Sequence, residues 1–417
     1  MRFLESFVFW YPAIMSTVWI VGALLFLERI ELKKPLPLTK TPMVSILIAC
    51  HNESSTIEHT LENLKDLDYP NYEIIAIDDG STDNTFEVLT QLLDKYSHLR
   101  IVKMKHNSGK ANALYHGLLV SKGEVLVGVD ADSYLEKDAL LYMVPHFTNT
   151  NSGERVGAVT GNPRVRNRSS LLSKIQLCEY ASIISLTKRT QRILGKVMTV
   201  SGVCVAYRKR ALLDCHLWDR DLLTEDVAIT WKLEKKFWDI RYEPRALCWM
   251  LVPEKFMNLW KQRRRWTSGG IEVFWRNRDI FTHWTERRLY PVGIEQLLSC
   301  FWAICWLILT IIGTIDFFQG APLMPYFWKS QFLSLICLVQ FLTAMVLDSR
   351  YDKTLVSNSL WAIWYPLVYW YVNAFVVLIS IPATIFNKRD GYATWSSPDR
   401  GLKERNSNTQ GGKSNGQ

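Results

Sequence analysis

Short apolar runs alternate with amphipathic stretches through the first half of the chain. The short runs are rich in Val and Ile and end at turn residues, as buried strands do, while the longer stretches repeat apolar residues at helical spacing. Strands are expected at residues 44–50, 72–77, 101–104, 125–129, 156–161 and 198–207, and helices at 54–67, 82–96, 110–120, 138–147, 171–190 and 225–236. Strands that alternate with helices of this length predict an α/β fold with a parallel, doubly wound sheet.

Longer apolar runs flank this region. One precedes it, residues 7–27, and three follow it, residues 294–318, 330–347 and 355–386. The first is too long for the apolar core of a signal peptide, and no small-residue cleavage site follows it, so it predicts a membrane span. The runs 294–318 and 355–386 also predict spans, whereas 330–347 is only just long enough and contains Gln331 and Gln340.

The charges beside these runs predict an orientation. Arg29, Lys33 and Lys34 follow the first run, which places the next region in the cytoplasm by the positive-inside rule. Four spans in total put the C-terminal tail outside, but Lys388 and Arg389 favour an inside tail. The sequence therefore leaves the number of crossings open.

Between the α/β region and the C-terminal apolar runs lies an amphipathic stretch. Residues 256–275 carry Trp and Phe on one face and Lys261, Arg263 and Arg264 among the polar positions, which is typical of a helix that lies on a membrane surface. The expected organisation is a membrane helix and linker at 1–42, a cytoplasmic α/β domain at 43–253, an interfacial helical region at 254–290, membrane segments at 291–387 and a polar tail at 388–417.

The composition and the position of the charges indicate which kind of ligand the chain binds. The chain has 417 residues and a formal charge of +9, and many of its 17 Trp lie beside the apolar runs of the last third. Lys and Arg crowd next to those runs, which favours anionic lipid headgroups and diphosphates over nucleic acid. The eight Cys include no C-x-x-C pair and no His at zinc spacing, so we expect free thiols and no structural zinc site.

The strand that begins at Val125 ends in two carboxylates, Asp130 and Asp132. Strand spacing of two places both side chains on one side of the backbone, at the sheet edge where open α/β sheets bind ligands. No Lys or Arg stands nearby to neutralise them, so the pair predicts a site for Mg²⁺ or Mn²⁺ carrying nucleotide phosphates. The alternative is an acidic cap on the helix that follows.

Three further motifs flank this pair in the sequence, and each has a simpler structural interpretation. Asp78-Asp79-Gly80-Ser81 suits an ordinary turn at a strand end. Thr224-Glu225-Asp226 suits a helix N-terminus with Thr224 as the cap. The stretch from Gln262 to Trp266 suits the polar face of an interfacial helix. All of these motifs occur in this order on one α/β domain flanked by apolar runs, and such an arrangement is improbable by chance. The order therefore favours a functional interpretation over the structural ones.

In this order the motifs resemble those of the processive, inverting family 2 glycosyltransferases, which include cellulose, chitin and hyaluronan synthases. Within that family the sequence is most similar to the branch that makes the β-1,6-linked N-acetylglucosamine polymer of biofilms, and the likeness covers nearly the whole chain. The segments that carry it are 51–53, 107–113, 161–164, 251–254 and 393–401. The resemblance implies a GT-A-like fold for the cytoplasmic domain.

The resemblance also implies roles for individual residues. The uracil and ribose are expected to be contacted by His51, Glu53 and Asp79, the rest of the nucleotide by Lys110 and Asp130, and the metal by Asp132. The general base is expected to be Asp226. The diphosphate is expected to be held by Gln262 and Arg265, and Trp266 is expected to stack on the acceptor sugar. His51 stands where the family pattern has Tyr. The segment Thr394-Trp395-Ser396 is either a gate over the nucleotide or a disordered peptide.

The implied activity is the polymerisation of N-acetylglucosamine from UDP-GlcNAc into poly-β-1,6-N-acetylglucosamine, with export of the polymer through the plasma membrane. The implied partners are the growing polysaccharide, the lipid bilayer and a small accessory membrane subunit. Three alternatives remain: a synthase of the hyaluronan, chitin or cellulose kind, a non-processive transferase that acts on a lipid acceptor, and a transporter with a cytoplasmic α/β module. The few apolar runs and the scarcity of charges inside them disfavour the transporter.

Overall fold

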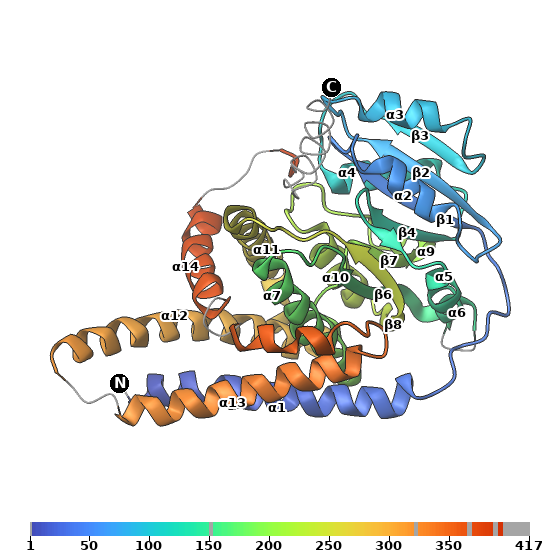
Figure 1. Ribbon diagram of the computed structural model, residues 1–417. Helices are drawn as coiled ribbons and strands as arrows, with labels where there is room; N and C mark the ends of the chain where they lie inside the picture. Colours follow the sequence, from blue (N-terminus) through green and yellow to red (C-terminus); the bar gives the residue numbers. More distant parts are fainter. Residues whose placement is uncertain (1, 150–152, 321–323, 365–368, 387–390, 395–417) are drawn as a thin grey trace, which may run out of the picture. The chain divides into compact units, whose positions relative to one another are not determined.

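The computed structural model describes residues 2–149, 153–320, 324–364, 369–386 and 391–394 (Figure 1). The chain forms two compact units. The sheet unit contains residues 35–173, 199–262 and 389–417, and the helical unit contains residues 1–34, 174–198 and 263–388. Residues 174–198, which the sequence placed within the α/β domain, therefore group with the apolar helices.

The sheet unit is built from alternating strands and helices (Figure 1). Its elements are β1 (Val44–Cys50), α2 (Ile57–Leu64), β2 (Tyr72–Asp78), α3 (Thr85–Leu92), β3 (Leu99–Lys103), α4 (Lys110–Val120), β4 (Val125–Asp130), β5 (Tyr134–Leu135), α5 (Ala139–Met143), α6 (Pro145–Thr148), η2 (Gly153–Arg155), β6 (Val156–Val165), β7 (Cys204–Arg208), α9 (Lys209–Asp214), α10 (Glu225–Lys235) and β8 (Asp239–Met250). The helices α7 (Leu171–Glu179) and α11 (Phe256–Arg276) cross the division between the two units.

The eight strands described by the structure form one sheet in the order β3-β2-β1-β4-β7-β6-β8-β5. Strands β3, β2, β1 and β4 are parallel, as expected, but β7 is antiparallel to both β4 and β6, and β5 is antiparallel to β8. The prediction of a parallel sheet is therefore wrong for β7 and β5, although β6 and β8 do pair in parallel, and the sheet is mixed. The reversal arises because β7 enters from a loop at the carboxyl edge of β4, so it must run back along that strand.

The core of the sheet unit lies on both faces of the strands. Alternate residues of β1, such as Ile46 and Ile48, pack with α2, α3 and α5 on one face. On the other face α4 lies so close to the sheet that a Cβ at Gly117 would be 2.8 Å from Ile77 Cδ1 and 3.2 Å from Leu47 Cδ2. Burial on both faces explains why β1 and β2 carry continuous apolar runs, at residues 46–50 and 74–77, rather than an alternating pattern.

The helical unit contains the long apolar helices. Its elements are α1 (Arg2–Phe26), η1 (Leu27–Glu31), η3 (Tyr180–Ser185), α8 (Leu186–Leu194), η4 (Arg278–Phe281), η5 (Trp284–Leu289), α12 (Tyr290–Phe318), α13 (Met324–Asp348), η6 (Val356–Trp364) and α14 (Tyr371–Phe386). Among the described residues, three helical stretches are long and apolar enough to cross a membrane: Arg2–Glu31, Trp284–Phe318 and Gln331–Asp348. The run 330–347, which the sequence marked as barely long enough, is one of them.

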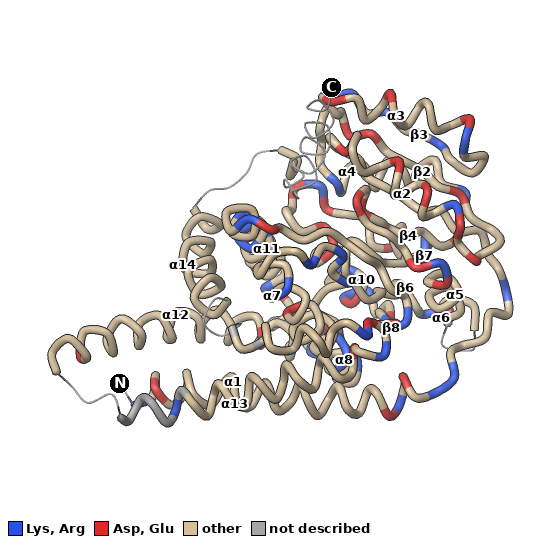
Figure 2. The backbone as a smooth tube through the Cα atoms, viewed as in Figure 1, with Lys and Arg blue, Asp and Glu red and all other residues tan. Residues whose placement is uncertain are grey.

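Side-chain contacts fix the relative directions of these three helices. Ser16 Oγ of α1 donates a hydrogen bond of 2.6 Å to Gln340 Oε1 of α13, and both side chains are buried. Trp302 Nε1 of α12 donates to the carbonyl of Val8 at 3.0 Å. Figure 2 shows that Lys, Arg, Asp and Glu are confined to the ends of α1 and α13.

The two ends of the α1–α13 pair are held by different ion pairs. At one end Arg189 of α8 binds Glu31 with its Nε at 2.7 Å and Asp348 with its Nη1 at 2.8 Å, and all three side chains are at most 1% exposed. At the other end Lys329 lies 3.4 Å from Glu5. The helices α1 and α13 are therefore parallel to each other.

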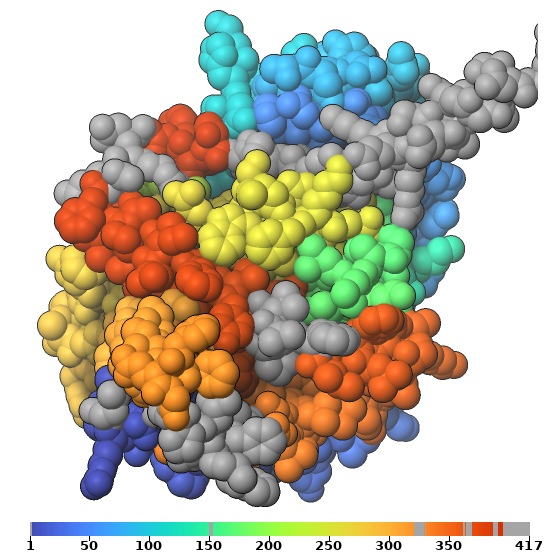
Figure 3. All heavy atoms as spheres, turned by 60° about the vertical axis from the view of Figure 1, so that its left-hand side comes forward, coloured from blue at the N-terminus to red at the C-terminus, as the bar shows by residue number. Residues whose placement is uncertain are grey.

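The run 355–386 is not one membrane span. Its described part forms the 3₁₀ segment η6 and the 16-residue helix α14 instead. Helix α14 packs along α12, where the Tyr371 and Trp306 rings lie 4.4 Å apart and Ala374 contacts Ala303 and Leu307, and Figure 3 shows these two helices side by side. Hydropathy suggested a span because helix–helix packing and lipid both select apolar residues.

Candidate active site

The predicted nucleotide-binding motifs follow three neighbouring strands of the sheet unit. The parallel register pairs Cys50 with Asp78 and Ala49 with Asp130, so β1, β2 and β4 end at the same edge. The loops that contain His51, Asp79 and Asp132 therefore leave the sheet together, as the sequence predicted.

Asp79 holds the loop that precedes α4. Its two carboxylate oxygens accept hydrogen bonds from the backbone N–H groups of Ser108 at 2.9 Å and Gly109 at 2.8 Å, and its side chain is fully buried. The turn at Gly80 (φ +61°) is closed by the same loop, because a Cβ there would lie 2.5 Å from the carbonyl carbon of His106. Asp79 thus shapes the entrance to α4.

His51 and Glu53 are also buried beside this loop. The Nδ1 of His51 lies 3.0 Å from the carbonyl of Asp79, and its Nε2 lies 3.0 Å from the side-chain nitrogen of Asn107. Glu53 accepts a hydrogen bond of 2.7 Å from Thr56 Oγ1. Both predicted residues therefore belong to the same loop cluster as Asp79.

Lys110, the first residue of α4, joins the acidic motifs. Its ammonium lies 2.6 Å from Asp130 Oδ1, 3.3 Å from Glu225 Oε1 and 3.2 Å from the carbonyl of Gly202. Burial lowers the pKa of Lys110, but Asp130, Glu225 and Asp226 raise it further, so the net shift is upward and the group stays charged. The expectation that no cation neutralises the acidic pair is wrong, since a lysine twenty residues earlier reaches Asp130.

Asp132 follows the end of β4 in a turn. It is 3% exposed and accepts a hydrogen bond of 3.2 Å from Ser133 Oγ. Among the residues that the structure describes, no three His, Cys, Asp or Glu side chains cluster as a preformed metal site. Asp130 and Asp132 still fit a Mg²⁺ or Mn²⁺ ion that takes its other ligands from water and phosphate, because such ions commonly use one or two carboxylates.

Asp226 lies in the first turn of α10. Its Oδ1 accepts the N–H of Val227 at 2.9 Å and its Oδ2 accepts the N–H of Gly202 at 3.3 Å. Burial and the adjacent Glu225 raise the pKa of Asp226 to about 6, against the opposing effect of Lys110 and the two backbone donors. A carboxyl group with this pKa is ionised at neutral pH yet remains basic enough to accept a proton.

Thr224 occupies the N-cap position of α10 without capping it through its side chain. Its hydroxyl is buried and, among the described residues, has no hydrogen-bond partner. The predicted side-chain cap is therefore absent, and the carbonyl of Thr224 accepts the N–H of Ala228 instead. The acidic residues at this helix start face the site rather than serving only the helix.

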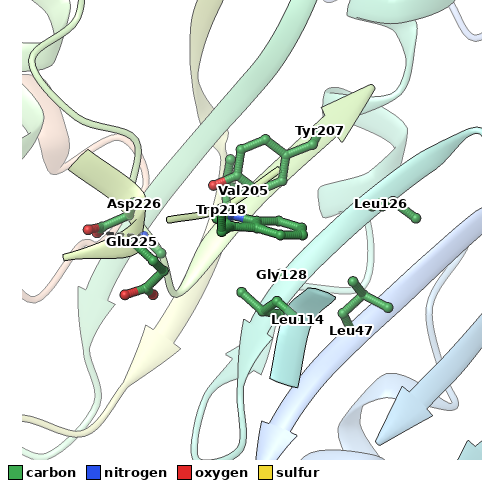
Figure 4. Close-up of a pocket in the computed structure, with 10 residues that line it drawn as sticks. Leu47, Leu114, Leu126, Gly128, Val205, Tyr207, Trp218, Glu225 and Asp226 are labelled. Atoms are coloured by element: carbon green, nitrogen blue, oxygen red, sulfur yellow. Dashed lines mark hydrogen bonds between the residues drawn. The ribbon is translucent and has the colours of Figure 1, made fainter. Parts of the chain in front are cut away.

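A small pocket opens beside the two carboxylates of α10. Figure 4 shows Glu225 and Asp226 at one end, the Tyr207 and Trp218 rings next to them, and leucines beyond. The two rings meet edge to face with centroids 5.7 Å apart. The lining residues come from β1, β4, β7, α4, α10 and the loops before β7 and α10, and are Leu47, Leu114, Leu126, Gly128, Gly202, Val205, Tyr207, Trp218, Glu225 and Asp226. These apolar walls account for the weak hydration of Asp226.

The remaining predicted residues lie on α11. Gln262 is partly buried and its Oε1 has no hydrogen-bond partner among the described residues. Arg265 is exposed, and Trp266 is partly buried. Gln262 and Arg265 are three residues apart on this helix and so occupy the same face.

The first residues of the C-terminal tail contact the sheet unit at the start of α4. The N–H of Ala393 donates to the carbonyl of Arg220 at 2.9 Å, and a Cβ at Gly109 would lie 2.1 Å from the carbonyl oxygen of Ala393. The guanidinium of Arg220 binds Asn112 Oδ1 at 3.2 Å and lies over the Tyr392 ring at 5.5 Å. Sequence reasoning missed Arg220, whose only signal is its position four residues before the T-E-D motif. The rest of the expected gate, from Trp395 onward, lies outside the described residues.

An acidic pair at the carboxyl edge of a doubly wound sheet, a lysine that bridges it to a second acidic motif and a carboxyl group suited to base catalysis together define a glycosyltransferase with a GT-A-like fold. The comparisons with known proteins agree. The model of the family described as glycosyltransferase like family 2 matches residues 42–269. The chain belongs to this family.

Curated relatives match almost the entire chain. The poly-β-1,6-N-acetyl-D-glucosamine synthase of Staphylococcus epidermidis is 42% identical over 414 residues, which cover 96% of this chain and 99% of the relative. The synthase of the same name from Staphylococcus aureus (strain COL) is 42% identical over 416 residues, with the same coverage. Among solved structures, a mannosyltransferase of Pyrobaculum calidifontis in complex with GDP-Man and Mn²⁺ is similar in fold, with a TM-score of 0.59 and 20% identity over 91% of this chain and 99% of that one. Together with its apolar helices, the family places this enzyme in the membrane.

Proposed function

We propose that this chain is a processive, inverting polysaccharide synthase that transfers N-acetylglucosamine from UDP-GlcNAc to a growing poly-β-1,6-N-acetylglucosamine chain and exports the product for biofilm formation. The observation that carries the proposal is the 42% identity to synthases of this polymer across 96% of the chain. The site described above supplies the chemistry that such a transfer needs.

Asp226 is the proposed general base. An inverting transfer needs one carboxylate to take the proton of the acceptor hydroxyl as it attacks the donor sugar, and it forms no covalent enzyme intermediate. The pKa of about 6 and the partial exposure of Asp226 support this role. The hydrogen bond from Gly202 fixes the carboxylate, leaving the lone pairs on its other side for the acceptor.

Lys110, Asp130 and Asp132 are the proposed binding residues for the diphosphate end of the donor. Lys110 carries a permanent charge at the first turn of α4, where the helix dipole also favours phosphate. Asp130 and Asp132 would hold Mg²⁺ or Mn²⁺, which when bound neutralises charge on the departing UDP. Asp79, His51 and Glu53 are proposed to shape the uracil and ribose pocket, Asp79 chiefly through the loop that it holds.

The residues of α11 are proposed to serve the acceptor and the leaving group. The guanidinium of Arg265 matches the geometry of phosphate oxygens, and Gln262 on the same helix face supplies a further polar group. Trp266 offers a flat apolar surface on which a sugar ring can stack. The exposure of Arg265 supports its availability to a ligand.

We further propose three membrane crossings, with the N-terminus outside and both the sheet unit and the tail in the cytoplasm. Helices α1 and α13 are parallel, and α12 is antiparallel to α1 because Phe301 contacts Phe7 near the start of α1 and Glu295 bonds with Trp19 further along it. The end of α1, the start of α12 and the end of α13 therefore share one side.

The positive charges near the helix ends agree with this orientation. Arg29, Arg287 and Lys353 all lie on the side assigned to the cytoplasm. The contact of Ala393 with the sheet unit then needs no further crossing. Because η6 and α14 follow α13, we place them on the cytoplasmic side as well. The segment Thr394-Trp395-Ser396 is proposed as a gate over the nucleotide, as the family resemblance implies. A small accessory membrane subunit remains part of the proposal, as the family resemblance implies.

The test uses the full chain in membranes supplied with radiolabelled UDP-GlcNAc or UDP-Glc in Mg²⁺. We expect a long polymer from UDP-GlcNAc alone, resistant to β-1,4-specific chitinase and cleaved by a β-1,6-specific glucosaminidase. Membranes that contain the Asp226→Asn variant serve as the negative control for polymer synthesis. A product of one added sugar would reject processivity, and incorporation from UDP-Glc or cleavage by chitinase would reject the donor or the linkage.

A further inference from the structure

Three consecutive arginines on α11 have different environments. Arg263 is only 6% exposed, whereas Arg264 and Arg265 are both exposed. Successive residues of an α-helix point about 100° apart, so a single turn presents one of the three side chains to the neighbouring helices. The buried arginine is therefore Arg263, whereas the proposed phosphate ligand is the exposed Arg265.

Arg263 is held by a buried carboxylate. Its Nη2 donates to Glu179 Oε2 at 2.7 Å, and Glu179 is 3% exposed. The ring of the fully buried Tyr369 lies 5.5 Å from the same guanidinium, in addition to the ion pair with Glu179. A charge-assisted bond in a dry environment fixes the guanidinium more firmly than a surface ion pair does.

Glu179 is itself placed by an irregular helix. It is the last residue of α7, and the π-helical segment η3 follows it directly. A π-helical turn changes the direction of the side chains that flank it, and such turns often occur at functional sites. The carboxylate is thereby a rigid reference point against which Arg263 is positioned.

Arg263 covers one face of Trp266. Its guanidinium carbon lies 4.4 Å from the centroid of the ring, and the two residues are three apart on the same helix face. Trp266 keeps partial exposure. Since one face of the ring is stacked on the guanidinium, a sugar ring has access only to the opposite face.

We propose that Arg263 is a positioning residue for the acceptor sugar: anchored by Glu179, it orients the Trp266 ring so that one defined face receives the terminal sugar of the growing chain. The inference rests on the proposed function, in which Trp266 carries the acceptor. Lysine at this position keeps the charge that Glu179 requires but lacks the planar group that stacks on the ring. The substitution Arg263→Lys therefore separates stacking from folding.

The experiment compares purified full-length enzymes in lipid nanodiscs: wild type, Arg263→Lys, Trp266→Ala and the control Arg264→Lys. Three quantities are measured: UDP release from UDP-GlcNAc without acceptor, the KM for the donor, and the KM for a short β-1,6-linked N-acetylglucosamine oligomer. We expect Arg263→Lys to raise the acceptor KM about fivefold or more and to shorten the product, because the stacking contact is lost. Donor KM and acceptor-free UDP release stay within about twofold of wild type, and Arg264→Lys matches wild type in all three.

The outcomes separate the inference from the function on which it rests. If Trp266→Ala raises the acceptor KM and Arg263→Lys does not, the positioning role is wrong while the proposed function stands. If Arg263→Lys changes donor KM and acceptor KM equally, Arg263 has a general structural role and the inference fails. If Trp266→Ala leaves the acceptor KM unchanged, or wild type releases no UDP from UDP-GlcNAc in the presence of the oligomer, the proposed function itself is rejected.

Discussion

The ammonium of Lys110 lies 2.6 Å from a carboxylate oxygen of Asp130, and the same ammonium contacts Glu225 at the start of α10. This lysine thus links the acidic pair after β4 to the helix that carries Asp226. In the proposed function, a metal held by Asp130 would compete with the ammonium of Lys110 for this oxygen, and the displaced ammonium would then be available for phosphate.

Replacing Lys110 by Ala should weaken donor binding more than it affects folding. Loss of one charge-assisted phosphate contact is expected to raise the donor KM by about 10- to 100-fold. Because Lys110 also lowers the pKa of Asp226, the acid limb of the pH–rate profile should move to higher pH. Steady-state UDP release across pH measures both effects, and the exposed Lys105→Ala is the control. An unchanged donor KM contradicts the assignment.

The ionisation of Asp226 should control the rate below neutral pH. Its pKa of about 6 means that the carboxylate is lost as the pH falls through that value. The turnover number at saturating substrates should therefore decrease about tenfold per unit below pH 6, and Asp226→Asn should lower it by about 10²- to 10⁴-fold while UDP still binds. Calorimetry of UDP binding to the variant checks the second part. Normal turnover by Asp226→Asn would exclude this residue as the base.

The same substitution should stabilise the protein. The folded pKa of Asp226 is raised above the value of about 3.9 in an unfolded chain, so its favourable contribution is present below pH 4 and is lost as the pH rises through 6. Asp226→Asn removes the ionisable group, and at pH 7.5 it should raise the free energy of unfolding by on the order of 1 to 2 kcal/mol, allowing for partial exposure. Thermal unfolding of both proteins at pH 7.5 and at pH 4 tests the sign, because the difference must shrink at the lower pH.

Asp132→Ala should affect nucleotide binding only when a divalent cation is present. Asp132 is buried at the end of β4, where it can serve as a metal ligand but donates nothing to the nucleotide directly. In Mg²⁺ the variant is expected to bind UDP at least tenfold more weakly than wild type, and in EDTA the two should bind alike. Titration calorimetry in the two buffers makes the comparison. Equal weakening in EDTA would show that Asp132 acts through the loop structure instead.

Two glycines with left-handed backbone test the contact between the tail and the sheet unit. At Gly109 (φ +87°) a Cβ would lie 2.1 Å from the carbonyl oxygen of Ala393, whereas at Gly195 (φ +99°) no atom lies within 4 Å. Alanine at either site imposes a backbone strain of about 1 kcal/mol, but only Gly109→Ala must displace the tail. Limited proteolysis should therefore cut the tail of Gly109→Ala faster than that of Gly195→Ala. Equal cutting rates would argue that the tail does not rest on Gly109.

The buried and the exposed ion pairs that tie α1 to its neighbours should differ greatly in strength. Arg189→Met leaves Glu31 and Asp348 buried without their cation and should cost about 3 to 5 kcal/mol of unfolding free energy. Lys329→Ala removes the exposed pair with Glu5 and should cost less than about 1 kcal/mol. Denaturation of both variants in detergent provides the test. Similar losses would mean that Arg189 is not the anchor of these helix ends.

The strongest local patterns in the sequence predicted the parallel part of the sheet and the helices beside it. Helix α4 occupies residues 110–120 as expected, and β1 begins and ends where its apolar run does. Strand β8 was missed because Arg241, Glu243 and Arg245 interrupt its apolar pattern, and it owes its place to pairing with β6. Such pairing depends on residues far away in the sequence.

The sequence indicated which side chains to consider for the site, but it did not indicate which of them contact one another. Asp130, Asp132 and Asp226 stood out because of the order of their motifs along the chain, while their link through Lys110 depends on the folded chain. Nor does the sequence distinguish Arg263 from Arg265, since only the position of α11 against its neighbours decides which guanidinium is buried. The sequence thus indicated which types of side chain to examine, and the fold determined which of them are in contact.

The hydrogen bond between Ser16 and Gln340 makes α1 more than a lipid anchor. An unrelated signal anchor of equal hydropathy would insert the chain correctly. It would, however, leave the Gln340 side-chain amide in the hydrocarbon without the hydrogen bond from Ser16. Chimeras and truncations at the N-terminus should accordingly be designed around this polar match, not around hydrophobic length alone.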